Sequence, residues 1–220
     1  MVFPLPWPAG LVPETESWTI ENADLSGGMS ITGFEQIVSA PAGRWKAALS
    51  FKLQREDVLD LRGLVFGLKG RAGTVMVGPF DLHGSPMAGA DDGWAVDLAL
   101  VETWQTTLPI QTPVEALTSE AAARRATSLS VKMAPGRRAR VGNYIGIEGR
   151  LHVVTSAAVV SDTDQALTIE PPLRAAVGSG VPVTFTGAAC PMRLASPVDS
   201  MTVTGGDHVT SVTLSFVEAP

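Results

Sequence analysis

The sequence has few of the residues from which cross-linked and metal-dependent proteins are built. It contains one cysteine, Cys190, and three histidines among 220 residues. A single cysteine excludes an internal disulfide, and it excludes a metal site made of several thiolates. Side-chain packing must therefore hold the fold together.

Charge is also scarce. Charged residues make up 17% of the chain, below the roughly 25% of soluble domains, while hydrophobic residues make up 45%. This balance excludes intrinsic disorder for most of the chain. The net charge is −6 and no large basic cluster offsets it. We therefore expect no direct binding of nucleic acid.

Long apolar runs are missing as well. No window approaches the roughly 18 consecutive apolar residues of a membrane-spanning helix. Residues 1–11 are apolar but lack a cationic start, so we do not expect a signal peptide. Prolines in this region instead predict an extended arm over residues 1–15. They are Pro4, Pro6, Pro8 and Pro13.

Strand patterns are present in the N-terminal half and at the end of the chain. Apolar residues alternate with other residues over 45–53, 94–104 and 211–217, which predicts three strands of one antiparallel sheet. Shorter strands are expected on both sides of a Ser26-Gly27-Gly28 turn, and one more before the Gly78-Pro79 break. Their predicted ranges are 18–23, 29–38 and 74–77.

Two helices are predicted beside these strands. Over 55–69, apolar residues recur at helical spacing, acidic residues occupy the first turn, and Gly70 follows the end. A Thr112-Pro113-Val114-Glu115 sequence has the spacing of a capping box and predicts a second helix over 113–125.

The composition changes near residue 127. Five short strand candidates separated by turns follow, which predicts a small β-barrel or sandwich. The expected fold is α+β and mainly β, with an antiparallel sheet domain of residues 16–126 and 188–220 carrying one or two helices. Residues 127–187 form a small β domain inserted into it. The five strand candidates are 128–133, 144–148, 151–160, 166–170 and 182–186.

No motif predicts catalysis, a metal or a cofactor. His83, His152 and His208 have no second ligand three or four residues away. We expect His83 in a polar loop, His152 on the solvent face of a strand and His208 after a turn. Cys190 is expected to be a small buried hydrophobic residue, because no histidine neighbours it.

The remaining candidates also have structural explanations. The carboxylates Asp91, Asp92, Asp162 and Asp164 stand in turn-forming sequences. The glycine-rich segment 67–73 follows a predicted helix and lacks the Gly-Lys-Ser/Thr ending of a phosphate loop, so it is expected to end that helix.

Two further groups of side chains each have two interpretations. Arg137, Arg138 and Arg140 form the one basic run, which predicts a solvated turn or a contact with an acidic neighbouring subunit. Four tryptophans are placed mainly on apolar strand faces, where core packing is favoured over a sugar-stacking platform. They are Trp18, Trp45, Trp94 and Trp104.

A series of short sequence strings resembles minor tail proteins of long-tailed bacteriophages, of the distal-tail type. The resemblance spans nearly the whole chain, and the order of the strings is more specific than any one of them. The strings are 26–30 (SGGMS), 43–47 (GRWKA), 68–73 (LKGRAG), 78–81 (GPFD), 142–145 (GNYI), 150–154 (RLHVV), 171–174 (PPLR) and 216–218 (FVE).

This resemblance implies an architectural protein without catalytic residues. It implies a closed ring of identical subunits, with six favoured and three as the alternative, that joins the tail tube to hub or fibre proteins in a virion assembled in the host cytoplasm. We expect the proline-rich arm to clasp a neighbouring subunit, so that deleting residues 1–13 weakens the ring but leaves the subunit folded.

Two other functions remain open at this stage. A carbohydrate-binding module for attachment to the host surface is the first alternative, and it requires a line of exposed aromatic side chains. A tail-associated cell-wall hydrolase is the second, and it requires converging carboxylates or a histidine-bound metal in a cleft.

Overall fold

A computed structural model of the chain describes residues 4–8, 10–22, 25–38, 43–53, 55–80, 116–134, 137–196 and 210–219. Two units are formed, one from Met1–Phe80 with Ala189–Pro220 and the other from Asp81–Ala188. The strand predicted at 94–104 and the loop predicted at 82–93 lie outside the described residues.

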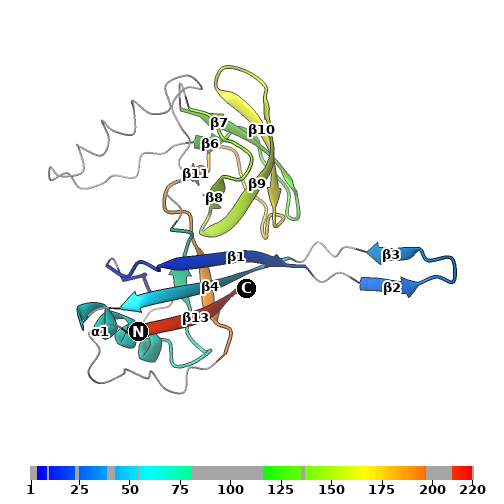
Figure 1. Cartoon of the computed structure of the whole chain (residues 1–220). Coiled ribbons are helices and arrows are strands. Elements are labelled where there is room, and N and C mark those ends of the chain that lie inside the picture. Colours follow the sequence, from blue (N-terminus) through cyan, green and yellow to red (C-terminus); the bar gives the residue numbers. More distant parts are fainter. Residues whose placement is uncertain are drawn as a thin grey trace. The chain divides into compact units, whose positions relative to one another are not determined.

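The first unit is built on a five-stranded antiparallel sheet (Figure 1). The C-terminal strand pairs with the strand that begins at Arg44, from Thr210 opposite Leu53 to Val217 opposite Lys46. The predicted pairing of these two distant segments is therefore confirmed. The order across the sheet is β1 (Thr15–Glu21), β4 (Arg44–Leu53), β13 (Thr210–Glu218), β12 (Cys190–Leu194) and β5 (Val75–Val77).

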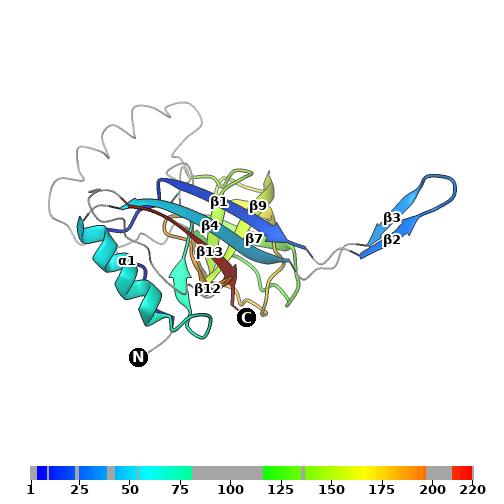
Figure 2. The same cartoon turned by 60° about the horizontal axis from the view of Figure 1, so that its bottom comes forward.

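Strict alternation in β4 gives this sheet one buried face. Every second residue of β4 is buried, as the sequence period predicts. Helix α1 (Arg55–Gly67) contacts β4 and buries its own apolar stripe (Figure 2). The helix ends where Lys69 and Gly70 adopt positive φ angles of 50° and 69°. The buried residues are Trp45, Ala47, Leu49, Phe51 and Leu53 of β4, with Val58, Leu61, Leu64, Val65 and Leu68 of the α1 region.

No helix formed by the described residues has both the length and the apolar character needed to cross a membrane.

The proline-rich segment packs on its own sheet. Leu5 donates its N–H to the Thr74 carbonyl at 2.8 Å and accepts a bond from Met76 N at 2.9 Å. The Trp7 ring lies 6.1 Å from the rings of Phe51 and Phe216. The segment is extended, as expected, and its buried Leu11 and half-buried Trp7 pack within their own subunit. A clasp on a neighbouring subunit stays a prediction.

A separate two-stranded sheet interrupts the connection between β1 and β4. It consists of β2 (Leu25–Met29) and β3 (Glu35–Val38), which pair with each other in antiparallel register. The predicted turn at 26–28 is wrong, because Gly27 and Gly28 lie within β2 at a register shift between Ser26 and Met29. A bulge uses glycine conformations as readily as a turn does. The chain reverses instead at residues 30–34.

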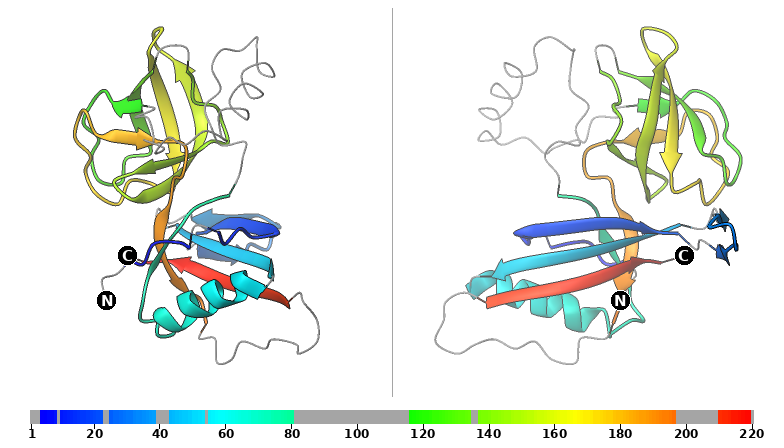
Figure 3. Two further views of the ribbon diagram at one scale, coloured as in Figure 1. Left: turned by 90° about the vertical axis from the view of Figure 1, so that its left-hand side faces the viewer. Right: turned by 45° about the vertical axis from the view of Figure 1, so that its right-hand side comes forward.

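The second unit contains a closed six-stranded antiparallel barrel (Figure 3). Inward-facing side chains fill it, including Leu129, Ile145, Leu167 and Val183. This confirms the expectation of a small β-barrel or sandwich. Around the barrel the strands follow the order β10 (Asp164–Glu170), β7 (Ser128–Met133), β6 (Ala116–Thr118), β11 (Pro182–Thr184), β8 (Tyr144–Ile147) and β9 (Arg150–Val159).

Close strand packing in the barrel requires glycine at position 146. A Cβ atom added there would lie 2.6 Å from Thr184 Oγ1 and 3.3 Å from Ala188 Cα. Gly146 is on β8 and Thr184 is its register partner on β11. The missing side chain therefore lets these two strands approach each other.

The second predicted helix is wrong over its described residues, 116–125. Residues 116–118 form β6, which pairs with β7 through Ala116 and Met133 and with β11 through Leu117 and Pro182. The local preference for a helix is overridden, because the backbone groups of residues 116–118 pair with two neighbouring strands of the barrel. The same pairing places residues 116–126 with the barrel, so the boundary predicted at 127 falls too late in the chain.

Candidate interaction surface

The catalytic candidates that the structure describes are His152, Cys190, Asp162 and Asp164. His152 is 1% exposed, and its Nδ1 lies 2.6 Å from the Pro171 carbonyl oxygen. The prediction of a solvent-facing histidine is wrong, because His152 lies opposite Ile145 and two residues before Val154, both in the barrel core. His152 is thus a buried structural residue.

Cys190 and Asp164 also have structural roles, whereas Asp162 is exposed beside Asp164 in the turn. Cys190 is fully buried in β12, as predicted. Asp164 accepts hydrogen bonds from Ser161 Oγ at 2.7 Å and Thr163 Oγ1 at 3.3 Å, so it stabilises the turn between β9 and β10. In the described part of the chain, no three metal-ligating side chains gather into a site.

Several predicted candidates cannot be located, because they lie outside the described residues. They are His83, Asp91, Asp92, Trp94, Trp104 and His208.

The basic run belongs to a turn held by buried amide side chains. Gln165 Oε1 accepts a hydrogen bond from Ala139 N at 2.8 Å, and Asn143 Oδ1 accepts one from Arg140 N at 2.7 Å. Arg138 and Arg140 are exposed. The prediction of a solvated turn is confirmed for these two residues.

The described tryptophans serve the core, as predicted. Trp45 is 2% exposed, and the half-buried Trp18 meets it edge to face at 5.9 Å. Trp18 pairs with Ala47, which is buried on β4. These rings are therefore used for packing within the subunit.

The β2–β3 hairpin, residues 25–38, differs from every other described element, because its side chains are left uncovered. Every residue from 26 to 38 is exposed. Its large apolar side chains each expose more than half of their surface. They are Met29, Ile31, Phe34, Ile37 and Val38.

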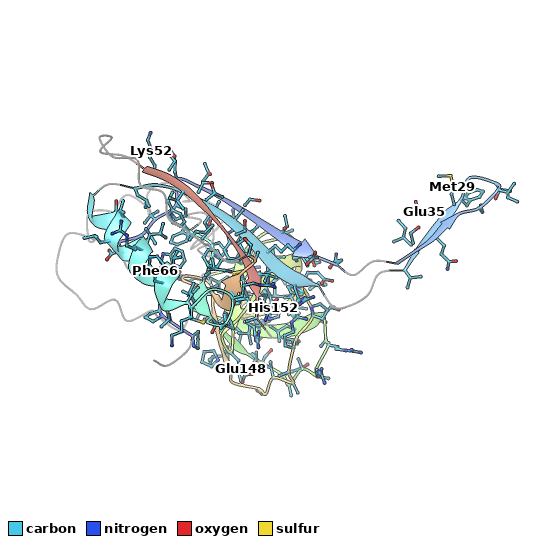
Figure 4. All side chains as sticks on the ribbon, turned by 90° about the horizontal axis from the view of Figure 1, so that it is seen from below. Met29, Glu35, Lys52, Phe66, Glu148 and His152 are labelled. Carbon is cyan, nitrogen blue, oxygen red and sulfur yellow. The ribbon has the colours of Figure 1, made fainter. Side chains whose placement is uncertain are left out.

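Strand register distributes these side chains over both faces of the hairpin. Ser26 pairs with Ile37, and Met29 pairs with Glu35, so these four residues share one face. Ser26 Oγ donates to Glu35 Oε1 on that face. Phe34 and Val38 occupy the opposite face by alternation. Figure 4 shows Met29 and Glu35 together on the hairpin. Both faces of the hairpin therefore expose apolar surface.

The tip of the hairpin has a defined geometry. Ser30 N donates to the Phe34 carbonyl at 2.8 Å, and Gly33 N donates to the Ser30 carbonyl at 2.9 Å. Phe34 N also donates to Ser30 Oγ at 3.1 Å. Gly33 has a φ of +82°, a conformation that favours glycine. These bonds present Ile31, which is fully exposed, at the end of the hairpin.

The outer face of α1 is a second exposed apolar surface in the same unit. Leu59 and Phe66 lie two helical turns apart, and each exposes more than half of its surface. Arg62 and Gly63 are exposed between them, and nothing lies within 4 Å of a Cβ atom added at Gly63. Phe66 is marked on the helix in Figure 4. We call these four residues the outer face of α1.

Sequence reasoning missed both surfaces. It assigned 29–38 to a single strand, although the Ser30-Ile31-Thr32-Gly33 sequence carries turn-forming residues. The available signal was the presence of apolar residues on both faces of the strand pair. In a strand with one face on a core, apolar and polar residues alternate more strictly.

Comparison of the chain with models of known protein families finds no match, and comparison with curated proteins finds none either.

Proposed function

We propose that the chain is a structural subunit of the tail tip of a long-tailed bacteriophage, of the distal-tail type. In this role it forms a closed ring of identical subunits, with six favoured and three as the alternative. The ring joins the tail tube to hub or fibre proteins of the host-recognition apparatus, and it is assembled in the host cytoplasm. The role requires no catalysis by the chain.

The uncovered β2–β3 hairpin is the observation that supports an assembling subunit. An isolated two-stranded hairpin is only marginally stable in water. Here five large apolar side chains on such a hairpin are exposed. Clustered exposed apolar surface of this kind marks contacts with other molecules. A subunit that assembles through the hairpin buries that surface, and the resemblance of the sequence strings to distal-tail proteins supplies the kind of assembly.

In the described part of the second unit, no exposed aromatic side chains support the carbohydrate-binding alternative. The aromatic residues within 116–134 and 137–188 are Tyr144, which is half-buried, and Phe185, which is buried. A sugar-binding platform needs exposed ring faces, so we keep the architectural role as the proposal.

Purification of the full-length protein tests this function. Native mass spectrometry and electron microscopy of the purified protein should show a ring of six or three copies. Quantitative mass spectrometry of purified tails should find the same number of copies per particle. A single copy in each tail, or absence of the protein from tails, would overturn the proposal.

A second assay tests the absence of catalysis. The purified protein should leave cell-wall polysaccharide and peptide unchanged over hours, with a known hydrolase as the positive control. Hydrolysis that disappears on replacing Asp162 or Asp164 would contradict an architectural role and favour the cell-wall hydrolase.

A further inference from the structure

We propose that the β2–β3 hairpin of one copy docks on the outer face of α1 of a second copy, so that identical subunits associate head to tail. This inference rests on the proposed function. It deepens that function by naming the two surfaces that meet in the subunit contact.

The distribution of exposed apolar side chains selects these two surfaces. In the described part of the first unit, large exposed hydrophobic residues occur on the hairpin, on the outer face of α1, and singly at Val12. The hairpin contributes five such residues and α1 contributes Leu59 and Phe66. Because single exposed apolar residues are ordinary, the hairpin and α1 are the two clusters in the described part of this unit that a partner would cover.

One charge on each surface is complementary to the other, Glu35 and Arg62, although Asp60, exposed next to Leu59, has the same sign as Glu35. Glu35 is the one charged residue in the sequence from 25 to 38. It lies on the same hairpin face as Met29 and Ile37. On α1, Arg62 lies between Leu59 and Phe66, and the four outer-face residues span about 100° of the helix. A carboxylate among apolar side chains therefore meets a guanidinium among apolar side chains.

The α1 backbone is accessible to the hairpin at Gly63. A hairpin presents a narrow ridge, with Ile31 exposed at its tip. Gly63 leaves open space on α1 beside Phe66, because nothing lies within 4 Å of its Cβ position. The hydrogen bonds at the tip hold the hairpin turn before docking, which reduces the entropy lost on association.

The hairpin and α1 do not cover each other within one copy. Both surfaces are exposed in the chain. The hairpin joins the sheet where Glu21 pairs with Arg44, whereas α1 follows the other end of β4, beyond Leu53. The ten residues of β4 span about 30 Å between these two points. Contact between the two surfaces is therefore supplied by a second copy.

This pairing excludes a two-fold contact between identical surfaces. Each copy carries one hairpin and one α1, so the contact joins two different surfaces. Contacts of this type generate closed rings when the rotation between subunits closes, whereas identical surfaces that meet give two-fold dimers. Head-to-tail docking thus agrees with a ring.

Mixing two complementary variants tests the docking. The first, Ile31→Ser with Phe34→Ser, has a defective hairpin and an intact α1. The second, Leu59→Ser with Phe66→Ser, has the reverse. All four side chains are exposed, so both variants should fold, which circular dichroism checks. In native mass spectrometry, each variant alone should be monomeric, and an equimolar mixture should form dimers with one copy of each.

The mixture separates this proposal from the proposed function. If the wild-type protein assembles but the mixture stays monomeric, head-to-tail docking is overturned while the ring remains possible through other surfaces. Hairpin-to-hairpin pairing would also overturn it, and predicts that the Leu59→Ser, Phe66→Ser variant, whose hairpin is intact, still associates with itself. If the wild-type protein stays monomeric and tails contain a single copy, the proposed function itself fails.

A charge exchange tests the register of the contact. Glu35→Arg and Arg62→Glu should each weaken association about ten-fold or more, because they place like charges together. Both changes in one chain should restore association to within a few-fold of wild type. Lys52→Glu, on an exposed position of β4, is the matched control and should leave association unchanged. A double variant as weak as the single variants would contradict pairing of these two residues.

Discussion

The barrel and the β2–β3 hairpin are both made of short antiparallel strands, but they meet water in opposite ways. Each barrel strand pairs with two neighbours, and the inward side chains fill a common core. The hairpin strands pair only with each other, and all residues from 26 to 38 are exposed. In a closed sheet the backbone groups of every strand are paired and the inward side chains are buried. In an open hairpin the outer backbone groups and the apolar side chains stay available to a partner.

The proline-rich N-terminal segment behaves like the barrel in this respect. In the sequence it resembles a peripheral arm, yet Leu11 is 1% exposed and the Trp7 indole donates to the Leu11 carbonyl at 2.7 Å. Peripheral position in the chain therefore does not separate self-sufficient segments from segments that need a partner. The two kinds of segment differ in whether their side chains are buried within the subunit.

The largest expected effect is on this segment. The double variant Trp7→Ala with Leu11→Ala should lower the free energy of unfolding by an amount on the order of 5 kcal/mol, because it removes the buried Leu11 and the half-buried Trp7 ring that packs near Phe51 and Phe216. Hydrogen exchange should show the loss in β4 and β13. The exposed neighbour variant Val12→Ala is the control. A stable double variant that has only lost assembly would instead make the segment a clasp.

A matched pair of apolar substitutions compares the barrel with the hairpin directly. Leu167→Ala in the buried barrel core should cost about 2–5 kcal/mol in unfolding free energy. Ile37→Ala on the exposed hairpin should change it by less than about 0.5 kcal/mol and should weaken assembly. Chemical denaturation and native mass spectrometry measure the two effects. Equal destabilisation by both variants would show that the hairpin is covered within its own subunit.

Closure of the barrel is tested at Gly146. Gly146→Ala should cost about 1–3 kcal/mol, because the added Cβ meets Thr184 and the Ala188 backbone. Gly178→Ala is the matched control in the same unit, since nothing lies within 4 Å of its Cβ position. Hydrogen exchange of β8 and β11 should increase only in the first variant. Unchanged exchange in both would argue against tight packing of these strands.

The smallest expected effect is at the hairpin tip. Gly33→Ala should destabilise the turn by about 1 kcal/mol, because alanine is strained at a φ of +82°. Faster exchange of the Ser30 and Phe34 amides in NMR spectra should report it, while barrel amides stay unchanged. Gly27→Ala, whose Cβ makes only ordinary contacts, is the control. Equal amide exchange in both variants would contradict a requirement for glycine at position 33 of the turn.

Local patterns predicted the elements in which one periodicity dominates. The alternation from Trp45 to Leu53 predicts β4, the three- and four-residue spacing with Gly70 predicts α1, and the matching pattern at 211–217 predicts β13. The short turn-bounded strands after residue 127 predict a small barrel or sandwich. In each case neighbouring residues in the chain already determine which face is buried.

The predictions are wrong where contacts between distant segments determine the local structure. Residues 116–118 carry a helix signal, but pairing with β7 and β11 makes them a strand. His152 alternates like a solvent-facing residue, but its register with Ile145 turns it into the barrel. Backbone pairing and burial depend on partners far away in the sequence, so no local pattern contains them.

The sequence by itself determined that this chain folds without disulfides, that it is mainly β, and that one helix follows the strand at 45–53. Composition and period are properties of neighbouring residues, and they set these outcomes before any tertiary contact forms. Only the tertiary structure decided that Trp7 and Leu11 of the proline-rich segment pack within their own subunit and that the hairpin side chains stay exposed. Both segments are apolar and contain glycine or proline. They differ because Trp7 of the proline-rich segment packs near Phe51 and Phe216 of its own sheet, whereas the hairpin side chains are exposed to solvent.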